Sequence, residues 1–191
     1  MNRKSIPTST EFEVREIDGK KYIEGYFSVF GAIYPLWEKG IETVDEGAFN
    51  LERDTDVRAL TNHDTTLVLG RTTAGTLELR TDERGLFGRI EINDADQDAV
   101  NLYERVKRRD VTQCSFGFDI LTEQIENRED GMTVWHIQEV KLYEVSVCTF
   151  PAYEDTGVTA RQKELEDINK RKMESWRADM LSKLKGENNG T

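Results

Sequence analysis

Apolar and polar residues alternate along short stretches of the chain between residues 11 and 150, and this two-residue period is typical of half-buried β-strands. Two pairs of these stretches flank short turns that carry Asp and Gly, so each pair predicts a β-hairpin. The predicted strands cover residues 12–17, 22–30, 57–62, 66–69, 76–81, 86–92, 113–126 and 134–150. Strands are therefore expected to dominate the protein.

Two segments follow a helical period instead. Residues 94–110 place Val100, Tyr103 and Val106 on one side of a predicted helix. Residues 161–185 space their apolar side chains mostly by three and four, with charged residues between them, which is typical of an amphipathic helix. These apolar residues are Leu165, Ile168, Met173, Trp176, Met180 and Leu184.

Hairpins that connect most of the strands, with one helix between them, predict a mainly β protein of the α+β class. We expect a closed or nearly closed antiparallel β-barrel with peripheral helices and a C-terminal amphipathic helix. The predicted organisation is a flexible N-terminal arm at residues 1–10, a folded domain at 11–160 and a charged helical tail at 161–191.

The charge is strongly negative and uneven along the chain. The formal net charge is −11. Residues 161–191 have a net charge of +2, and the residues before them have a net charge of −13. An acidic body argues against nucleic acid as a partner, because phosphate binding needs clustered Lys and Arg. No apolar run reaches the roughly 20 residues that span a bilayer, and residues 1–7 do not read as a secretory signal. Two cysteines, Cys114 and Cys148, are too few for a disulfide framework and fit a reducing cytoplasm.

Ser115 and His63 are the first candidates for chemistry. His63 follows a predicted strand at the start of a polar loop, where a rigid sheet can position a side chain and leave it accessible. Ser115 and Gly117 share one face of a predicted strand, while Cys114 points to the opposite face with Phe116. The pattern by itself favours a solvated serine and a structural histidine over catalytic roles.

Glu144 is the candidate for a third group. Apolar residues stand at even positions up to Leu142 and at odd positions from Val145, so the alternation slips next to Glu144 and predicts a β-bulge. A carboxylate re-aimed by such a bulge could accept the Nδ1 hydrogen of a histidine. A surface glutamate remains the alternative, and His136 could take the third place instead.

Other groups of residues give only weak signals for catalysis or metal binding. A Cys114–His63 pair would make a cysteine-dependent hydrolase, but Cys114 is expected to face the core when Ser115 faces a cleft. Two histidines and two cysteines lack the paired spacing of a zinc site. The alternating acids Asp94, Asp96 and Asp98 lack the glycine and the closing Glu of a calcium loop. The sequence therefore predicts neither a metal nor a cofactor.

Four blocks, in this order, resemble the HK97-type prohead proteases, a branch of the herpesvirus-assemblin-like serine proteases. The blocks are GYFSVFG at 25–31, LTNHD at 60–64 with LGR at 69–71, CSFGF at 114–118 and EVSVCTFPAY at 144–153. No single block is decisive, but the ordered set is specific and lies within residues 11–160. The resemblance implies a barrel of the herpesvirus-protease type and a serine protease domain over this range.

The resemblance also implies roles. His63 would be the base, Ser115 the nucleophile and Glu144 the orienting third member, with Glu139 and then His136 as alternatives. The herpesvirus enzymes carry a second histidine where this chain offers Glu144. The implied function is a prohead maturation serine endopeptidase of a tailed phage that cuts capsid or scaffold segments and itself.

The same resemblance implies a place and partners for the protein. The expected partners are the major capsid protein with its scaffolding segment, and a second copy in a homodimer, but no nucleic acid and no membrane. The expected location is the host bacterial cytoplasm, inside the assembling prohead. A non-catalytic scaffold or capsid-assembly protein on the same barrel is the alternative function.

Overall fold

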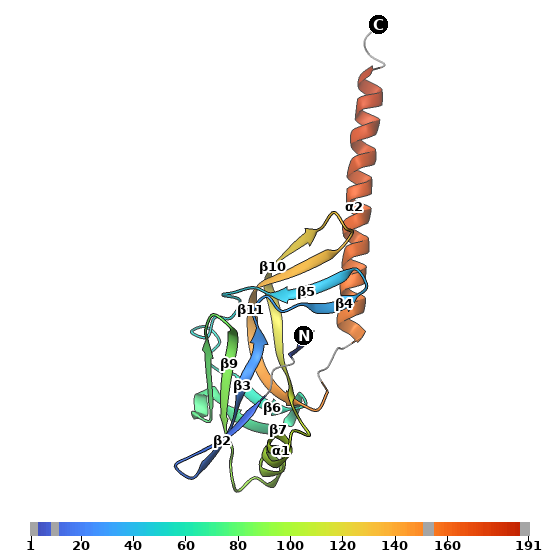
Figure 1. The fold of residues 1–191 in the computed structure, drawn as a ribbon. Coiled ribbons are helices and arrows are strands. Elements are labelled where there is room, and N and C mark those ends of the chain that lie inside the picture. The colour runs from blue at the N-terminus through green and yellow to red at the C-terminus, as the bar shows by residue number, and fades with distance from the viewer. Residues whose placement is uncertain (1–3, 9–11, 151–154, 188–191) are drawn as a thin grey trace. The chain divides into compact units, whose positions relative to one another are not determined.

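A computed structural model describes residues 4–8, 12–150 and 155–187 of the chain. The chain divides into two compact units, Met1–Tyr153 and Glu154–Thr191. The first unit holds the strands and one helix, and the second contains the helix α2 (Asp155–Glu187) (Figure 1). The helix that the sequence predicts over residues 161–185 lies within α2.

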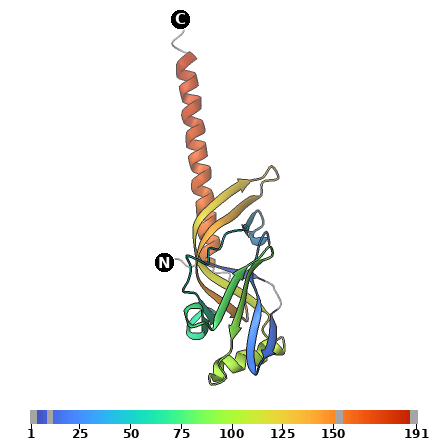
Figure 2. The same ribbon diagram turned by 90° about the vertical axis from the view of Figure 1, so that its left-hand side faces the viewer.

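The larger sheet of the first unit is built on a long hairpin, β10–β11 (Figures 1 and 2). On one side β1 pairs with β10, and on the other side β11 pairs with β5 along its first part and with β6 near its end. β4 continues the sheet beyond β5, and β7 continues it beyond β6. The strands are β1 (Lys4–Thr8), β4 (Tyr34–Trp37), β5 (Gly40–Val44), β6 (Arg58–Thr61), β7 (Asp64–Arg71), β10 (Gln113–Asn127) and β11 (Thr133–Cys148).

The smaller sheet has the order β2-β3-β9-β8, and every pair in it is antiparallel. Its strands are β2 (Glu13–Ile17), β3 (Lys20–Val29), β8 (Leu77–Thr81) and β9 (Gly85–Glu91). The two hairpins that the sequence predicts are confirmed here as β2–β3 and β8–β9. A short 3-10 helix, η1 (Thr72–Ala74), precedes β8.

The inner faces of the two sheets share one hydrophobic core. Phe27 and Leu86 of the smaller sheet and Phe116, Phe118 and Val145 of the larger sheet are all completely buried in it. Complete burial of such side chains stabilises the fold by about 1.5–3 kcal/mol each. Alternation along β10 sends every second side chain inward, which fixes the face on which the remaining side chains lie.

Neither sheet closes into a barrel, so the predicted closed or nearly closed antiparallel barrel of the herpesvirus-protease type is wrong. Among the described residues, the larger sheet ends at β1, β4 and β7, and the smaller sheet ends at β2 and β8. The pairs β11–β5 and β11–β6 are parallel, so the larger sheet is also not wholly antiparallel. The sheets meet through side chains of the shared core rather than through a continuous ladder. The mainly β, α+β composition is confirmed.

Helix α1 (Gln97–Lys107) lies in the first unit and buries Ala99, Leu102 and Val106. The side chain of Asp96 caps it by accepting hydrogen bonds from the backbone amides of the first turn, which satisfies donors that lack a helical partner. Among the described residues, no helix combines the length and the apolar character needed to cross a bilayer.

Part of the predicted N-terminal arm pairs with the larger sheet. Lys4–Thr8 forms β1, whose residues lie opposite Phe118 back to Cys114 in antiparallel register. The segment therefore reaches the strand that carries Ser115.

Candidate active site

The residues that the sequence singles out lie on two adjacent strands and in the turn that follows a third. Ser115 lies on β10, Glu144 lies on β11, and His63 lies in the turn that follows β6. β11 stands between the other two, antiparallel to β10 and parallel to β6. Residues far apart in the sequence therefore meet because of strand order.

His63 is held by a two-residue turn between β6 and β7. Thr61 and Asp64 pair across this turn, and its central residues Asn62 and His63 have φ of 51° and 60°. Positive φ at both central positions is the mark of a type I′ hairpin turn, and Asn and His are among the non-glycine residues enriched at positive φ. The candidate base therefore lies in a left-handed backbone conformation within a tight turn.

Hydrogen bonds tie this turn to the end of β11. The backbone amide of Asn62 donates to the Val147 carbonyl at 3.0 Å, and the Asn62 side-chain oxygen accepts from the Thr149 amide at 2.8 Å. The backbone amide of His63 donates to Ser146 Oγ at 3.2 Å. The imidazole is consequently fixed beside the strand that carries Glu144.

The imidazole of His63 contacts the Glu144 carboxylate directly. Nδ1 of His63 lies 2.7 Å from Oε1 of Glu144, and Ser146 Oγ donates to Oε2 at 2.6 Å. The Glu144 side chain is only 5% exposed, while that of His63 is 23% exposed. A buried carboxylate with both oxygens bonded is a firm anchor for one nitrogen of a histidine.

A bulge and a glycine make room for this carboxylate. Gly117 pairs with Glu144 but Phe118 pairs with Leu142, so Tyr143 is an extra residue on β11. The bulge that the sequence predicts next to Glu144 is therefore confirmed. A Cβ at Gly117 would overlap with Oε1 of Glu144, so the glycine admits the carboxylate.

The surroundings of His63 favour its protonated form. Burial by itself lowers the pKa of His63, but hydrogen bonds and charge interactions with Cys148 and Glu144 outweigh it and raise this pKa to about 10. The imidazolium is the form that a neighbouring carboxylate stabilises. A histidine that is protonated at neutral pH must lose its proton before it can act as a base.

Ser115 lies next to these groups on β10. Its Cα partner on β11 is Ser146, whose hydroxyl oxygen lies 3.4 Å from His63 Nδ1. Paired residues of neighbouring strands project to the same face, so Ser115 shares a face with Ser146. Ser115 is completely buried.

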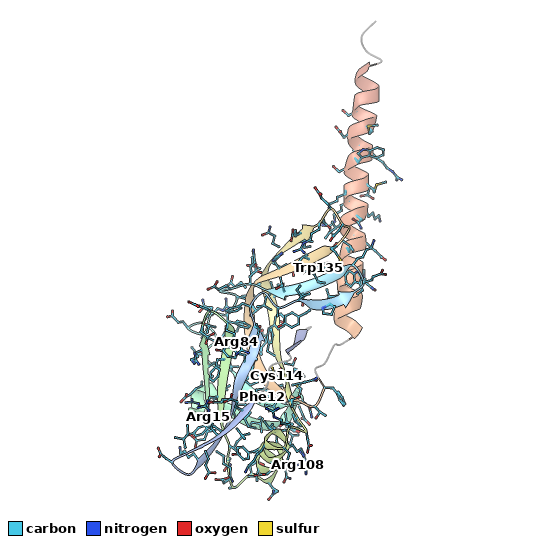
Figure 3. The ribbon with its side chains drawn as sticks, viewed as in Figure 1. Phe12, Arg15, Arg84, Arg108, Cys114 and Trp135 are labelled. Atoms are coloured by element: carbon cyan, nitrogen blue, oxygen red, sulfur yellow. The ribbon has the colours of Figure 1, made fainter. Side chains whose placement is uncertain are left out.

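Cys114 points the other way, as the sequence predicts. It is buried with Phe116 and Phe118 in the core, and its thiol donates to the Tyr26 carbonyl at 3.2 Å. Figure 3 shows Cys114 within the body of the first unit. This orientation separates Cys114 from the face that carries His63.

The chain also matches known proteins. Residues 10–171 match the family described as caudovirus prohead serine protease, which is most of the chain. The chain belongs to this family. It is 30% identical over 192 residues to the prohead protease of Enterobacteria phage HK97. The alignment covers 95% of this chain and 80% of that protein. The chain is therefore a phage capsid maturation protease, a peptidase that interacts with capsid proteins.

A solved structure is also similar. It is that of the bacteriophage T4 capsid assembly protease, gp21, and the superposition covers 79% of this chain and 100% of the gp21 chain. The sequence identity is 11% and the TM-score is 0.47.

The two alternative third members of this protease lie elsewhere on β11. Glu139 accepts from the Arg53 guanidinium at 2.5 Å. His136 lies between two carboxylates, with Nδ1 at 3.1 Å from Asp45 and Nε2 at 3.3 Å from Glu126. Burial lowers the pKa of His136, but its hydrogen bonds and charge interactions with these carboxylates outweigh burial and raise that pKa. Both side chains are engaged along the part of β11 that precedes the bulge, whereas Glu144 contacts His63.

Two supporting residues of the prohead protease were not predicted. Ser146 connects Glu144 to the turn of His63, and its place two residues after Glu144 on the same strand face was the available signal. Asp54 is fully buried and accepts from the Leu142 amide at 2.9 Å and from Lys141 at 2.8 Å, just before the bulge. Nothing in the sequence near Asp54 links it to β11.

No group of three or more His, Cys, Asp or Glu side chains is placed to hold a metal ion in the part of the chain that the structure describes.

Proposed function

We propose that the chain is a serine endopeptidase in which Ser115 is the nucleophile, His63 the general base and Glu144 the carboxylate that orients His63. The 2.7 Å contact between His63 Nδ1 and Glu144 Oε1, on the strand next to Ser115, is the observation that carries the proposal. Such a contact fixes the tautomer of the imidazole and leaves Nε2 as the nitrogen that handles protons.

The reaction follows acyl-transfer logic. Ser115 Oγ attacks the carbonyl carbon of a peptide bond while His63 Nε2 takes the hydroxyl proton. The same nitrogen then gives that proton to the leaving amine, and the carbon–nitrogen bond breaks to leave an acyl-Ser115 ester. Water, deprotonated by His63, hydrolyses the ester and restores the serine. Glu144 stabilises the imidazolium that forms in each half of the cycle.

We propose as substrates the scaffolding segment of the major capsid protein, or a separate scaffold, and the protease itself. The kinship with the HK97 prohead protease supports this assignment. The reaction then takes place in the host cytoplasm, inside the assembling prohead. A homodimer belongs to the same proposal.

The helix α2 is proposed to bring the protease into the prohead. Its side chains Met173, Trp176 and Met180 are 50%, 56% and 41% exposed, with spacings of three and four residues. Exposed apolar residues in this spacing suit a helical partner such as a coiled-coil scaffold.

Co-expression with the capsid protein tests the nucleophile. Wild type should yield trimmed capsid protein by mass spectrometry, and Ser115→Ala should reduce cleavage by about 1,000-fold or more, as loss of a serine nucleophile does. Ser28→Ala is the matched control, because Ser28 is also a completely buried strand serine but lies on β3 outside the site. It should trim like wild type.

Other outcomes would change the assignment. Equal trimming by wild type and Ser115→Ala would remove Ser115 from the mechanism and direct attention to Cys114, which alkylation would then test. No trimming by wild type, in a sample that has assembled proheads, would favour a non-catalytic assembly role.

A further inference from the structure

Strand β1 occupies the edge of β10 at the proposed nucleophile. The antiparallel register sets Ile6 opposite Phe116, Pro7 opposite Ser115 and Thr8 opposite Cys114. On its other side, Ser115 already has Ser146 of β11 as its partner. Both backbone neighbours of Ser115 are therefore taken by segments of the same chain.

This arrangement leaves a peptide substrate no free sheet edge at Ser115. Reaction requires a substrate carbonyl carbon within about 3–3.5 Å of the attacking oxygen. An extended peptide reaches such a position most readily by adding to a strand edge, where main-chain hydrogen bonds supply affinity without a demand on sequence. The edge that such a peptide would need beside Ser115 is the one that β1 holds, and Ser115 is completely buried.

We infer that the outer edge of β10 at Cys114–Phe118 binds the extended substrate peptide, and that β1 is an intramolecular occupant that must leave before cleavage. This inference rests on the proposed function of Ser115. The occupant that replaces β1 is an extended segment of the protein substrate, bound antiparallel to β10 in the register that β1 shows.

β1 has the properties of a displaceable occupant. It is five residues long and contains Pro7, which has no backbone N–H and is therefore confined to edges of sheets. It also lies outside residues 10–171, the range that matches the protease family. A short edge strand of this kind can be exchanged while the core strands stay paired.

The expected size of the effect follows from competition. If β1 holds the edge about nine-tenths of the time, the apparent affinity for a substrate peptide falls about tenfold. A chain in which β1 cannot pair should therefore cleave about tenfold faster at low substrate concentration. The maximal rate at saturating substrate should change much less.

The test uses the full chain with the double substitution Ser5→Pro and Ile6→Pro. Backbone amides of consecutive strand residues point to opposite sides, so one of the two prolines removes an N–H that faces β10. The matched control is Asn2→Pro with Arg3→Pro, which makes the same change just before the paired residues. The substrate is purified capsid protein, and initial cleavage rates are measured below saturation.

We expect cleavage about tenfold faster for Ser5→Pro/Ile6→Pro and an unchanged rate for the control. An equal rate in a folded double variant would overturn the inference, while loss of activity on adding Ser115→Ala to that variant would leave the proposed nucleophile intact. Cleavage that survives Ser115→Ala would instead reject the proposed function, and the inference with it.

A second measurement does not depend on the folding of the variant. A synthetic peptide of residues 1–10 should inhibit the wild-type chain in competition with the capsid protein, and a peptide of the same composition in scrambled order should not. Absence of inhibition by the residue 1–10 peptide at millimolar concentration would overturn the inference even if the proline variant fails to fold.

Discussion

Among single residues, Glu144 links His63 to Ser146 through its carboxylate. One oxygen meets His63 Nδ1 at 2.7 Å and the other accepts from Ser146 at 2.6 Å, and Gly117 leaves the space that the carboxylate fills. A methyl group at Gly117 would meet the far end of a flexible side chain rather than backbone. The carboxylate would therefore move, and the strands would keep their pairing.

Gly117→Ala is accordingly expected to uncouple Glu144 from His63 while the fold persists. Cleavage of capsid protein should fall by about 100-fold or more, as expected when a general base loses its orientation. The pKa of His63, followed by NMR titration, should fall toward its ordinary value because the carboxylate moves away. A variant with full activity and an unchanged His63 pKa would show that the carboxylate does not orient the base.

The raised pKa of His63 predicts the pH dependence of cleavage. The base must be neutral to take the proton of Ser115, so activity should rise with pH through the folded-state pKa of His63, which is about 10. Glu144→Gln removes one of the interactions that favour the imidazolium and should move this limb to lower pH while it reduces the maximal rate. An acid limb that Glu144→Gln leaves in place would assign the limb to another group.

The raised pKa of His63 makes the free energy of unfolding change with pH in the opposite direction to activity. A pKa raised on folding means that the native state binds the His63 proton more tightly than the unfolded chain does. This contribution to the free energy of unfolding is fully present below about pH 6.5, the ordinary histidine pKa, and is lost as pH rises through the folded pKa of about 10. Raising the pH therefore produces neutral His63, the form that can act as a base, and lowers the free energy of unfolding.

At the scale of elements, hairpin turns and one bulge place the site. The β6–β7 turn carries His63, and its bonds to Val147 and Thr149 fix it to β11. The bulge at Tyr143 redirects Glu144 toward that turn. Each device is local, yet it acts on a partner more than 80 positions away in the sequence.

Asn62→Ala tests the turn. Alanine lacks the amide that binds the Thr149 N–H and tolerates φ of 51° less well, so the free energy of unfolding should fall by roughly 1–2 kcal/mol. Activity should fall as well, because His63 shares the turn. Urea denaturation and capsid cleavage measure the two effects.

The matched control is Asp18→Ala in the turn between β2 and β3. Asp18 has φ of 52° and occupies the equivalent first position of a two-residue turn, since Ile17 pairs with Lys20. It should lose comparable stability and keep its activity. Equal loss of activity in both variants would assign the effect to general destabilisation.

At the scale of the whole molecule, the strand-rich unit and α2 are separate compact units with separate proposed roles. The first contains its own hydrophobic core and the candidate active site. The second presents apolar side chains along a helix whose other residues are mostly charged or polar. Substitutions on α2 should therefore affect entry into the prohead and not the chemistry.

Replacing Met173, Trp176 and Met180 with Ser should strongly reduce the amount of protease in purified proheads, because the apolar contacts with the proposed helical partner are lost. Cleavage of purified capsid protein in solution should stay within about twofold of wild type. Quantitative immunoblots of proheads and solution assays measure the two quantities.

The control triple Lys172→Ser, Glu174→Ser and Arg177→Ser changes exposed residues next to the apolar ones and should package normally. Normal packaging of the apolar triple variant would reject α2 as the docking segment.

The sequence by itself determined the local elements and the candidate residues. Alternation predicted the hairpins β2–β3 and β8–β9, and the slip in alternation beside Glu144 predicted the bulge, because side-chain period and backbone register are local properties. Alternation also predicted that Cys114 faces the core, where the structure places it. The four ordered blocks indicated the protease family, which the match over residues 10–171 confirms.

Tertiary structure decided which strands become neighbours. Parallel pairing of β6 with β11 brings His63 to Glu144, and two open sheets replace the expected barrel. It also places β1 beside Ser115 and Asp54 beside the bulge. These contacts join distant segments through a shared core and unsatisfied strand edges, and no local pattern of side chains records which edge meets which.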